Sequence, residues 1–507
     1  MLNFIKKNIN HIIFLLLIVY SQYYSPVISD DWFYHKNFDY FIVDRPLSSF
    51  FIIKIHQLIN YDAFFDNFKF FKATYLSLAY FFLYKFYSIF ISKNYSQFFS
   101  FFAIFYPLHD SANFEIWFIG HLLCMILPLY SYYLFNKKYN YFAYTIFALS
   151  SFISYSALPT QISLICYKII KKNYKRALIL TSLFLVYIFY YLINFYVFEK
   201  GIQRIGVGFD KDSTNLIYEI ISFQNIAIHI GSFLDVLIGP SHFIKVLFSI
   251  INNSLLSIII SLILTIFFFN ILKNNNIFHK GFFFKALFII LVTLVSSQIL
   301  FVISTKFINI TFGLGNRVNI YISMLITLFI IWLTRFFNYK FLFILIFCFF
   351  LSFFGTTRYW ESVNKEIIKL ENDINYLSKK NTGQNIFLKN IEYVDFYNFK
   401  HIELLNFQNY LDWFIDSHNI NLNNNYFYLL KDIDKETFRY NSNFIIYDFE
   451  TSISKKLSNY NNLVFEYNNY NNYYNFRHWL QYFDLSKISF LLPNHYISKF
   501  IDLTKRD

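Results

Sequence analysis

Residues 243–272 read FIKVLFSIINNSLLSIIISLILTIFFFNIL, an apolar run that contains a single charged residue, Lys245. A helix of about 20 apolar residues is long enough to cross the hydrocarbon core of a bilayer. The stretch therefore predicts a membrane-spanning helix. It decides the fold class because many other stretches of the chain have the same character.

The composition of the whole chain agrees with this interpretation. Of the 507 residues, 56% are hydrophobic and 15% are charged, and the mean hydropathy is +0.38. Soluble domains contain about 25% charged residues, so we expect an α-helical polytopic membrane protein. The formal net charge of +13 does not indicate a nucleic-acid partner, because most basic residues before position 340 lie in short loops between apolar runs.

About eleven apolar stretches predict membrane-spanning helices. We interpret the first as a retained signal anchor, because Lys6 and Lys7 precede its apolar run from about Ile12 to Tyr20 and no small-residue cleavage site follows it. The expected spans are residues 4–21, 70–91, 96–109, 116–135, 140–155, 157–170, 177–198, 243–272, 282–303, 319–337 and 340–356.

The basic loops orient these spans. Lys and Arg are enriched in cytoplasmic loops. With a cytoplasmic N-terminus, the alternation of the spans puts eleven further basic residues on that side: Lys93, Lys137, Lys138, Lys171, Lys172, Lys175, Arg176, Lys273, Lys280, Arg335 and Lys340. Residues 140–170 could form one long helix, but that helix would place the cluster from Lys171 to Arg176 outside. We therefore expect two short helices that turn at Pro159. The protein is then expected in a bacterial plasma membrane, with an extracytoplasmic C-terminus.

The composition changes at about residue 357, where charges of both signs appear and the apolar runs become too short to span a membrane. Apolar residues at helical spacing from Val363 to Leu377 predict that the last membrane helix continues beyond the membrane. We expect a transmembrane domain, 1–356, and a soluble extracytoplasmic α/β domain, 357–507. Short buried strands are expected at residues 427–430, 444–447 and 463–465.

Two adjacent carboxylates, Asp30 and Asp31, follow the first expected span and would face the outside of the bilayer. Ionisable groups next to hydrocarbon are costly and often mark function. One carboxylate of such a pair can act as a general base while its neighbour holds an arginine or a cation. We interpret the two residues as candidate catalytic groups; the alternative is that they are ordinary solvated loop residues.

Three arginines are candidates for binding phosphate. Arg45 and Arg317 would lie near the headgroup level, where the paired donors of a guanidinium match a phosphate. A local pair between Asp44 and Arg45, and a snorkelling Arg317 that anchors its helix, are the alternatives. Arg204 lies in a glycine-containing outer loop that we interpret as a mobile gate over a cavity, or else as an ordinary linker.

The second outer loop is very short but carries Asp110 and Glu115. These carboxylates could bind a metal, recognise substrate hydroxyls or, equally, cap the ends of two helices. We expect no resident cofactor or metal, because no His, Cys and Asp spacing in the chain is diagnostic of a metal site. His109 and His121 are expected to be structural residues.

The layout resembles the GT-C superfamily of integral-membrane glycosyltransferases, which includes protein O-mannosyltransferases, aminoarabinose transferases and bacterial O-antigen glucosyltransferases. The resemblance covers the chain up to about residue 360. It consists of a first helix, an acidic outer loop with Asp30 and Asp31, a segment at 47–59 suited to the membrane interface, about a dozen spans and an exported C-terminal domain.

The resemblance implies an inverting transfer of a sugar from a polyprenyl-phosphate-linked donor to a hydroxyl of a glycan, lipid or protein. It assigns Asp30 or Asp31 as the general base and, more weakly, an acidic role to Asp110 or Glu115. Some members of the superfamily use a divalent metal, but the later outer loops of this chain lack a clear acidic motif. A flippase for lipid-linked sugars and a glycan polymerase or ligase are the alternatives.

Overall fold

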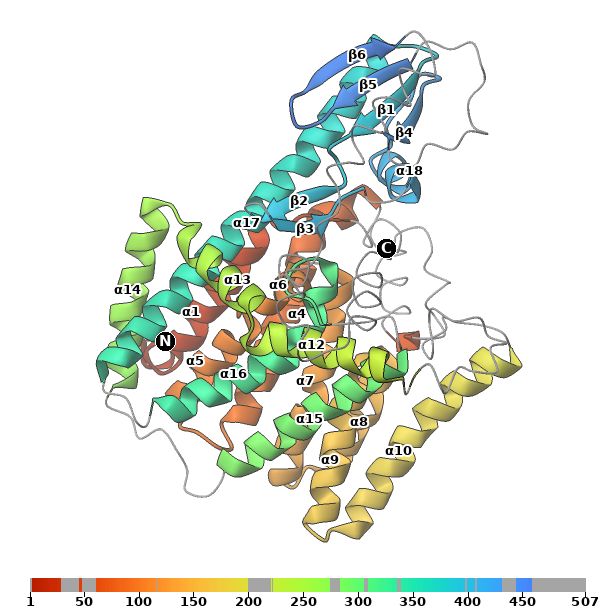
Figure 1. Cartoon of the computed structure of the whole chain (residues 1–507). Coiled ribbons are helices and arrows are strands. Elements are labelled where there is room, and N and C mark those ends of the chain that lie inside the picture. The colour runs from red at the N-terminus through yellow and green to blue at the C-terminus, as the bar shows by residue number, and fades with distance from the viewer. Residues whose placement is uncertain are drawn as a thin grey trace, which may run out of the picture. The chain divides into compact units, whose positions relative to one another are not determined.

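The computed structural model describes residues 2–28, 45–47, 61–114, 116–198, 220, 222–273, 283–304, 309–334, 339–396, 399–405, 408–430 and 444–457. The chain divides into two compact units (Figure 1). The helical unit comprises residues 1–25, 37–311 and 315–360, and the C-terminal unit comprises residues 26–36, 312–314 and 361–507.

The described part of the helical unit consists largely of apolar helices. Its described helices are α1 (Leu2–Tyr23), α4 (Tyr61–Tyr87), α5 (Lys93–Ile104), α6 (Asp110–Phe114), α7 (Ile116–Asn136), α8 (Asn140–Ile153), α9 (Leu158–Ile170), α10 (Tyr174–Leu192), α12 (Phe223–Ile238), α13 (Pro240–Ile251), α14 (Leu255–Leu272), α15 (Phe283–Ser304) and α16 (Ile320–Leu333). Helix α17 (Tyr339–Lys380) belongs to this unit up to Trp360 and to the C-terminal unit from Glu361 onward. The described residues also form four short turns of other helical types: η2 (Pro107–His109), η3 (Tyr155–Ala157), η4 (Ile193–Val197) and η5 (Leu314–Asn319).

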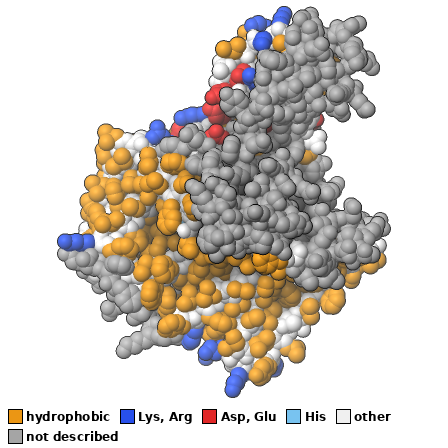
Figure 2. All heavy atoms as spheres, in the orientation of Figure 1, with side chains coloured by type: hydrophobic (Ala, Val, Ile, Leu, Met, Phe, Trp, Pro, Cys, Tyr) orange, Lys and Arg blue, Asp and Glu red, His pale blue; other side chains and the backbone are white. Residues whose placement is uncertain are grey.

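Six helical segments in the described part of the chain are long and apolar enough to cross a membrane, at 174–197, 225–251, 255–272, 283–304, 315–333 and 340–380. Their lipid-facing character is clearest on α14, where Leu255, Leu256 and Ile263 expose 76%, 67% and 60% of their surface. Figure 2 shows hydrophobic side chains over much of the visible face of this unit. The chain is thus a helical membrane protein, but the expected count of eleven spans is not confirmed.

The break expected within residues 140–170 is present. Helix α8 ends at Ile153, the turn η3 follows, and α9 begins at Leu158 with Pro159 in its first turn. The hydroxyl of Ser154 accepts a hydrogen bond from the backbone N–H of Ser156 at 3.3 Å, which caps the turn. Proline suits the first turn of a helix because its missing N–H has no intrahelical partner there.

The single helix expected over 243–272 is wrong, because the chain breaks between Ile251 and Leu255. The break is made by polar side chains that bind backbone groups. The side-chain amide of Asn253 donates to the carbonyl of Leu351 at 2.9 Å, and the hydroxyl of Ser254 caps α14 by accepting from the N–H of Ser257 at 3.2 Å. These bonds replace the backbone bonds that a continuous helix would have made.

Helices α14 and α17 run antiparallel. The contact between Asn253 and Leu351 lies near the first residue of α14, whereas the ring of Phe269, near its last residue, lies 5.4 Å from the ring of Phe343. Between these contacts the ring of Phe268 packs 5.7 Å from that of Phe350. The first residues of α17 and the last residues of α14 therefore lie at the same end of the helical unit.

The C-terminal unit begins along α17 and contains two small sheets. The larger has strand order β4-β1-β5-β6, with β1 (Asn385–Lys389) parallel to β4 (Tyr426–Leu429) and β5 (Phe444–Asp448), and with β6 (Ile453–Leu457) antiparallel to β5. The smaller is the hairpin of β2 (Tyr393–Phe396) and β3 (Phe399–Glu403), and α18 (Gln408–Ser417) precedes β4. The expected continuation of the last membrane helix and the strands near 427–430 and 444–447 are confirmed; residues 463–465 lie outside the described residues.

Helix α17 approaches α13 closely at Gly355. A Cβ atom at this position would overlap the backbone carbonyl of Ser249. The hydroxyls of Ser249 and Ser352 lie 2.7 Å apart, and the side-chain amide of Asn252 donates to the carbonyl of Gly355 at 3.0 Å. Glycine therefore allows the two backbones to meet and to exchange polar contacts inside an apolar unit.

Gly355→Ala should lower the free energy of unfolding by about 1–3 kcal/mol, because the added methyl forces the two helices apart. Thermal unfolding of the purified protein in detergent, followed by tryptophan fluorescence, measures the effect. The matched control is Gly231→Ala in α12, where a Cβ would meet no heavy atom within 4 Å. The control should leave stability unchanged or raise it by about 0.5–1 kcal/mol. Equal effects of the two substitutions would contradict the close approach.

Candidate functional site

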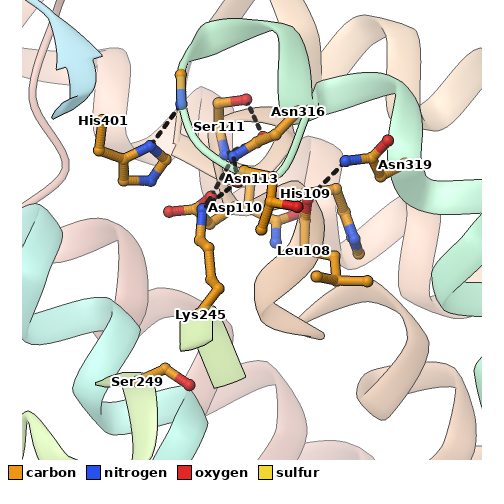
Figure 3. Close-up of polar contacts among 12 residues, drawn as sticks. Leu108, His109, Asp110, Ser111, Asn113, Lys245, Ser249, Asn316, Asn319 and His401 are labelled. Carbon is orange, nitrogen blue, oxygen red and sulfur yellow. Dashed lines mark hydrogen bonds and ion pairs between the residues drawn. The ribbon is translucent and has the colours of Figure 1, made fainter. Parts of the chain in front are cut away.

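A buried carboxylate, Asp110, forms the centre of a polar network in the helical unit (Figure 3). Asp110 is the first residue of α6 and is 1% exposed. Its Oδ1 accepts hydrogen bonds from Lys245 Nζ at 2.7 Å and from Asn316 Nδ2 at 2.6 Å, and its Oδ2 accepts one from Trp360 Nε1 at 2.9 Å. Three donors, from α13, η5 and α17, therefore converge on one carboxylate.

The network fixes the turn η5 at two points. The Oδ1 atom of Asn316 accepts from the backbone N–H of Ser111 at 3.2 Å and from its hydroxyl at 2.5 Å. Asn319 Nδ2 donates to the carbonyl of Leu108 at 3.1 Å and to that of Ile310 at 2.7 Å. Arg317 lies between these two asparagines, so its backbone is held by the η2–α6 segment.

A second buried lysine holds the other end of α6. Lys72, from α4, is fully buried, and its ammonium donates to the hydroxyl of Ser25 at 2.7 Å and to the carbonyl of Phe114, the last residue of α6. The ring of Phe114 stacks on that of Trp360 with centroids 4.8 Å apart. A cation at the C-terminus of a helix is favoured by the helix dipole.

His109 has a structural environment, in agreement with the expectation for it. Its ring is fully buried, with Nδ1 2.8 Å from the hydroxyl of Ser323 and Nε2 2.7 Å from the carbonyl of Ile104. Both ring nitrogens are therefore engaged in hydrogen bonds within the unit. Among the described residues, no three His, Cys, Asp or Glu side chains form a group that could hold a metal ion.

An apolar cavity of about 290 Å³ lies beside η5. Its wall comes from η3, α9, α10, α15 and the start of α16, and includes Tyr155, Tyr187, Leu300 and Phe301. Arg317 is the sole charged side chain among the described residues that line it. The cavity therefore combines a long apolar wall with one cation, a combination that suits an apolar chain with an anionic head.

A second arginine, Arg45, packs on one residue of the cavity wall. Arg45 is 4% exposed, and its guanidinium carbon is 5.4 Å from the centroid of the Tyr155 ring, which lines the cavity. A guanidinium over the face of an aromatic ring is held by cation–π attraction. Arg317 therefore lines the cavity, and Arg45, 272 positions away in the sequence, packs on the wall residue Tyr155.

The candidates from the sequence divide into three groups. Arg317 lines the cavity and Arg45 packs on the wall residue Tyr155, whereas Asp110 is the centre of the buried network. The rest lie outside the described residues: Asp30, Asp31, Asp44, Glu115, Arg204 and nearly all of the expected interfacial segment 47–59.

Several residues of the network were missed by sequence reasoning. Lys245 carried a usable signal, since it is the single charge in the run 243–272, and a charge inside an apolar helix requires a partner. No signal in the sequence indicated the other residues of the network. Asn316, Asn319 and Trp360 are far from Asp110 in the sequence, and Asn is abundant throughout the chain.

Comparisons of the chain with protein-family models, with curated proteins and with solved structures gave no match.

Lys245→Met should lower the free energy of unfolding by about 3–5 kcal/mol, because it leaves the buried carboxylate of Asp110 without its cation. The double variant Lys245→Met/Asp110→Asn removes both charges and keeps an amide oxygen to accept from Trp360. We expect it to recover at least half of the loss in a thermal unfolding measurement. Losses that simply add in the double variant would show that the two charges do not stabilise each other.

Proposed function

We propose that this protein is a membrane glycosyltransferase that moves a sugar from a polyprenyl-phosphate carrier to a hydroxyl acceptor on the extracytoplasmic face. The observation that carries the proposal is the apolar cavity with Arg317 in its wall. A prenyl chain is apolar and its phosphate is anionic, so the two parts of the carrier match the two parts of the cavity. The transfer itself is proposed from the resemblance to GT-C enzymes.

The distribution of charge supports the orientation that this proposal requires. Lys137, Lys171, Lys273 and Lys340 are all exposed and lie at turns or ends of helices. The turn between α9 and α10 and the joint ends of α14 and α17 lie in the lower part of Figure 1, away from α6. Basic loops favour the cytoplasm, so we propose that this end is cytoplasmic and that the polar network lies towards the opposite face.

In the proposed reaction the acceptor hydroxyl attacks the anomeric carbon of the donor sugar from the side opposite the carrier. The bond between that carbon and the phosphate oxygen breaks, the anomeric configuration inverts, and polyprenyl phosphate leaves. Arg317, with Arg45, would stabilise the charge that develops on the departing phosphate. An aspartate of the first outer loop, Asp30 or Asp31, would take the proton of the hydroxyl.

Within this proposal Asp110 acts as a positioning residue. It is buried and its oxygens are occupied by three donors, which favours a structural role over direct recognition of a substrate hydroxyl. Its bond to Asn316 fixes the residue that precedes Arg317 in the chain. The network would therefore hold the arginine beside the cavity before the donor arrives, which reduces the cost of ordering it on binding.

Arg317→Ala should raise the KM for the lipid-linked donor about 10- to 100-fold with a smaller effect on the KM for the acceptor. The size follows from a hydrogen bond to a charged group, which contributes about 1.5–3 kcal/mol. Arg317→Lys should retain part of the donor affinity, because it keeps the charge but loses the paired donors. The control is Lys273→Gln, an exposed cation at the end of α14. Unchanged donor dependence in Arg317→Ala would contradict the phosphate role.

Asp30→Asn and Asp31→Asn, made separately, should leave membrane insertion intact, and at least one should lower kcat about 100-fold or more, as expected for loss of a general base. The measurement is transfer of labelled sugar from a polyprenyl-phosphate donor in reconstituted vesicles. Full activity of the double variant would exclude both residues. Wild-type protein that moves the donor across the bilayer without forming a glycosylated product would instead support the flippase.

A further inference from the structure

The α7 to α10 region carries an unbalanced positive charge. Residues 116–198 contain no Asp or Glu. They contain seven strongly basic residues, Lys137, Lys138, Lys168, Lys171, Lys172, Lys175 and Arg176. We call these seven residues, together with Lys85 of α4, the basic cluster.

Four members of the basic cluster meet at two rings on the last turn of α7. The ring of Tyr133 has Lys85 Nζ at 5.9 Å and Lys137 Nζ at 5.8 Å from its centroid. The ring of Phe135 has Lys168 Nζ at 5.1 Å and the guanidinium carbon of Arg176 at 5.7 Å. Cations from α4, α9, α10 and the end of α7 are thus gathered around one helix end, where the helix dipole is negative.

Lys168 shows that the cluster is built into the fold and is not merely a solvated face. It is 8% exposed, and besides Phe135 its ammonium lies 5.4 Å from the ring of Tyr132 and 5.8 Å from that of Tyr167. Cation–π contacts of this kind contribute about 0.5–2 kcal/mol each. They offset part of the cost of bringing like charges together, but they supply no negative charge.

Among the described residues, no carboxylate supplies a counter-charge to these cations, since none forms an ion pair with a member of the basic cluster. Figure 2 shows Lys and Arg side chains together at the lower edge of the hydrophobic surface, where Figure 1 places the turn between α9 and α10. Like charges gathered at a low-dielectric boundary repel one another strongly, so an anion from outside the chain would stabilise them.

The surface beside the cluster is apolar and exposed. Tyr141 and Phe142, at the start of α8, expose 88% and 69% of their surface, and Ile170 and Tyr174, on both sides of the α9–α10 turn, expose 60% and 64%. A soluble anion has no apolar part that could cover these exposed side chains. An amphipathic anion can place its phosphate on the cations and its acyl chains on the exposed apolar side chains.

We propose that the basic cluster binds the headgroup of an anionic phospholipid. The phosphate lies among Lys168, Arg176 and the lysines of the α9–α10 turn, and the acyl chains run along α8 and α10. This site is separate from the cavity at Arg317, and it does not depend on the proposed glycosyl transfer.

The test uses the full-length protein in nanodiscs made of phosphatidylcholine alone or mixed with phosphatidylglycerol or cardiolipin. Anionic lipid should raise the melting temperature, and high salt should reduce the rise because it screens the headgroup charge. Two variants, Lys168→Gln/Arg176→Gln and Lys171→Gln/Lys172→Gln, should each lose at least half of the rise. The second variant changes only exposed side chains. It therefore still tests the proposal if loss of the buried Lys168 prevents the first variant from folding.

The control variant is Lys273→Gln/Lys365→Gln, which removes the same number of charges from exposed positions elsewhere and should keep the full rise. A full rise in both cluster variants, or an equal loss in the control, would overturn the proposal. Inorganic phosphate added to phosphatidylcholine nanodiscs tests a soluble anion; a rise as large as that from anionic lipid would overturn the lipid assignment. The expected result is no rise with phosphate.

Discussion

The buried ion pair between Asp110 and Lys245 is the interaction on which the order of the helical unit depends. A charge removed from water is costly unless it is paired and its remaining hydrogen-bonding capacity is satisfied. Here the carboxylate receives Lys245, Asn316 and Trp360. Because these donors come from α13, η5 and α17, the carboxylate links three elements that are distant in the sequence. An arrangement that separated them would leave a buried charge unpaired, which is costly.

The structure distinguishes a supporting residue, Asp110, from a candidate binding residue, Arg317, although the sequence suggested a substrate-binding role for both. Asp110 and Arg317 are both polar residues next to apolar helices, but they have opposite surroundings. Asp110 is enclosed by donors, whereas Arg317 lies in the wall of an apolar cavity. Asn316, adjacent to Arg317 in the chain, links the two. A rigid support beside an open cavity is the arrangement by which a binding group is held ready for its ligand.

The sequence predicted features that depend on local chemistry and missed those that depend on contacts between distant segments. The turn before Pro159, the continuation of the last membrane helix and two strands of the small sheet all follow from hydropathy, proline and spacing. The break between α13 and α14 was missed although Asn252, Asn253 and Ser254 were visible there. Three polar residues inside a long apolar run do not by themselves end a helix; the partner carbonyl of Leu351 makes the break favourable. The relation of Arg45 to the cavity that Arg317 lines likewise required the tertiary structure, because nothing local marks the wall residue Tyr155 as the neighbour of Arg45.

Charge in this protein is sparse, and the structure uses it in two distinct ways. In the network at Asp110 a negative group from the chain neutralises a lysine, and the result is a fixed connection between helices. In the basic cluster no described carboxylate plays that part, and aromatic rings of α7 hold the cations instead. Rings attract cations without cancelling their charge, so the cluster keeps a positive potential that the network has lost. Because this potential lies beside exposed apolar side chains, the headgroups of surrounding anionic lipids can supply the missing negative charge.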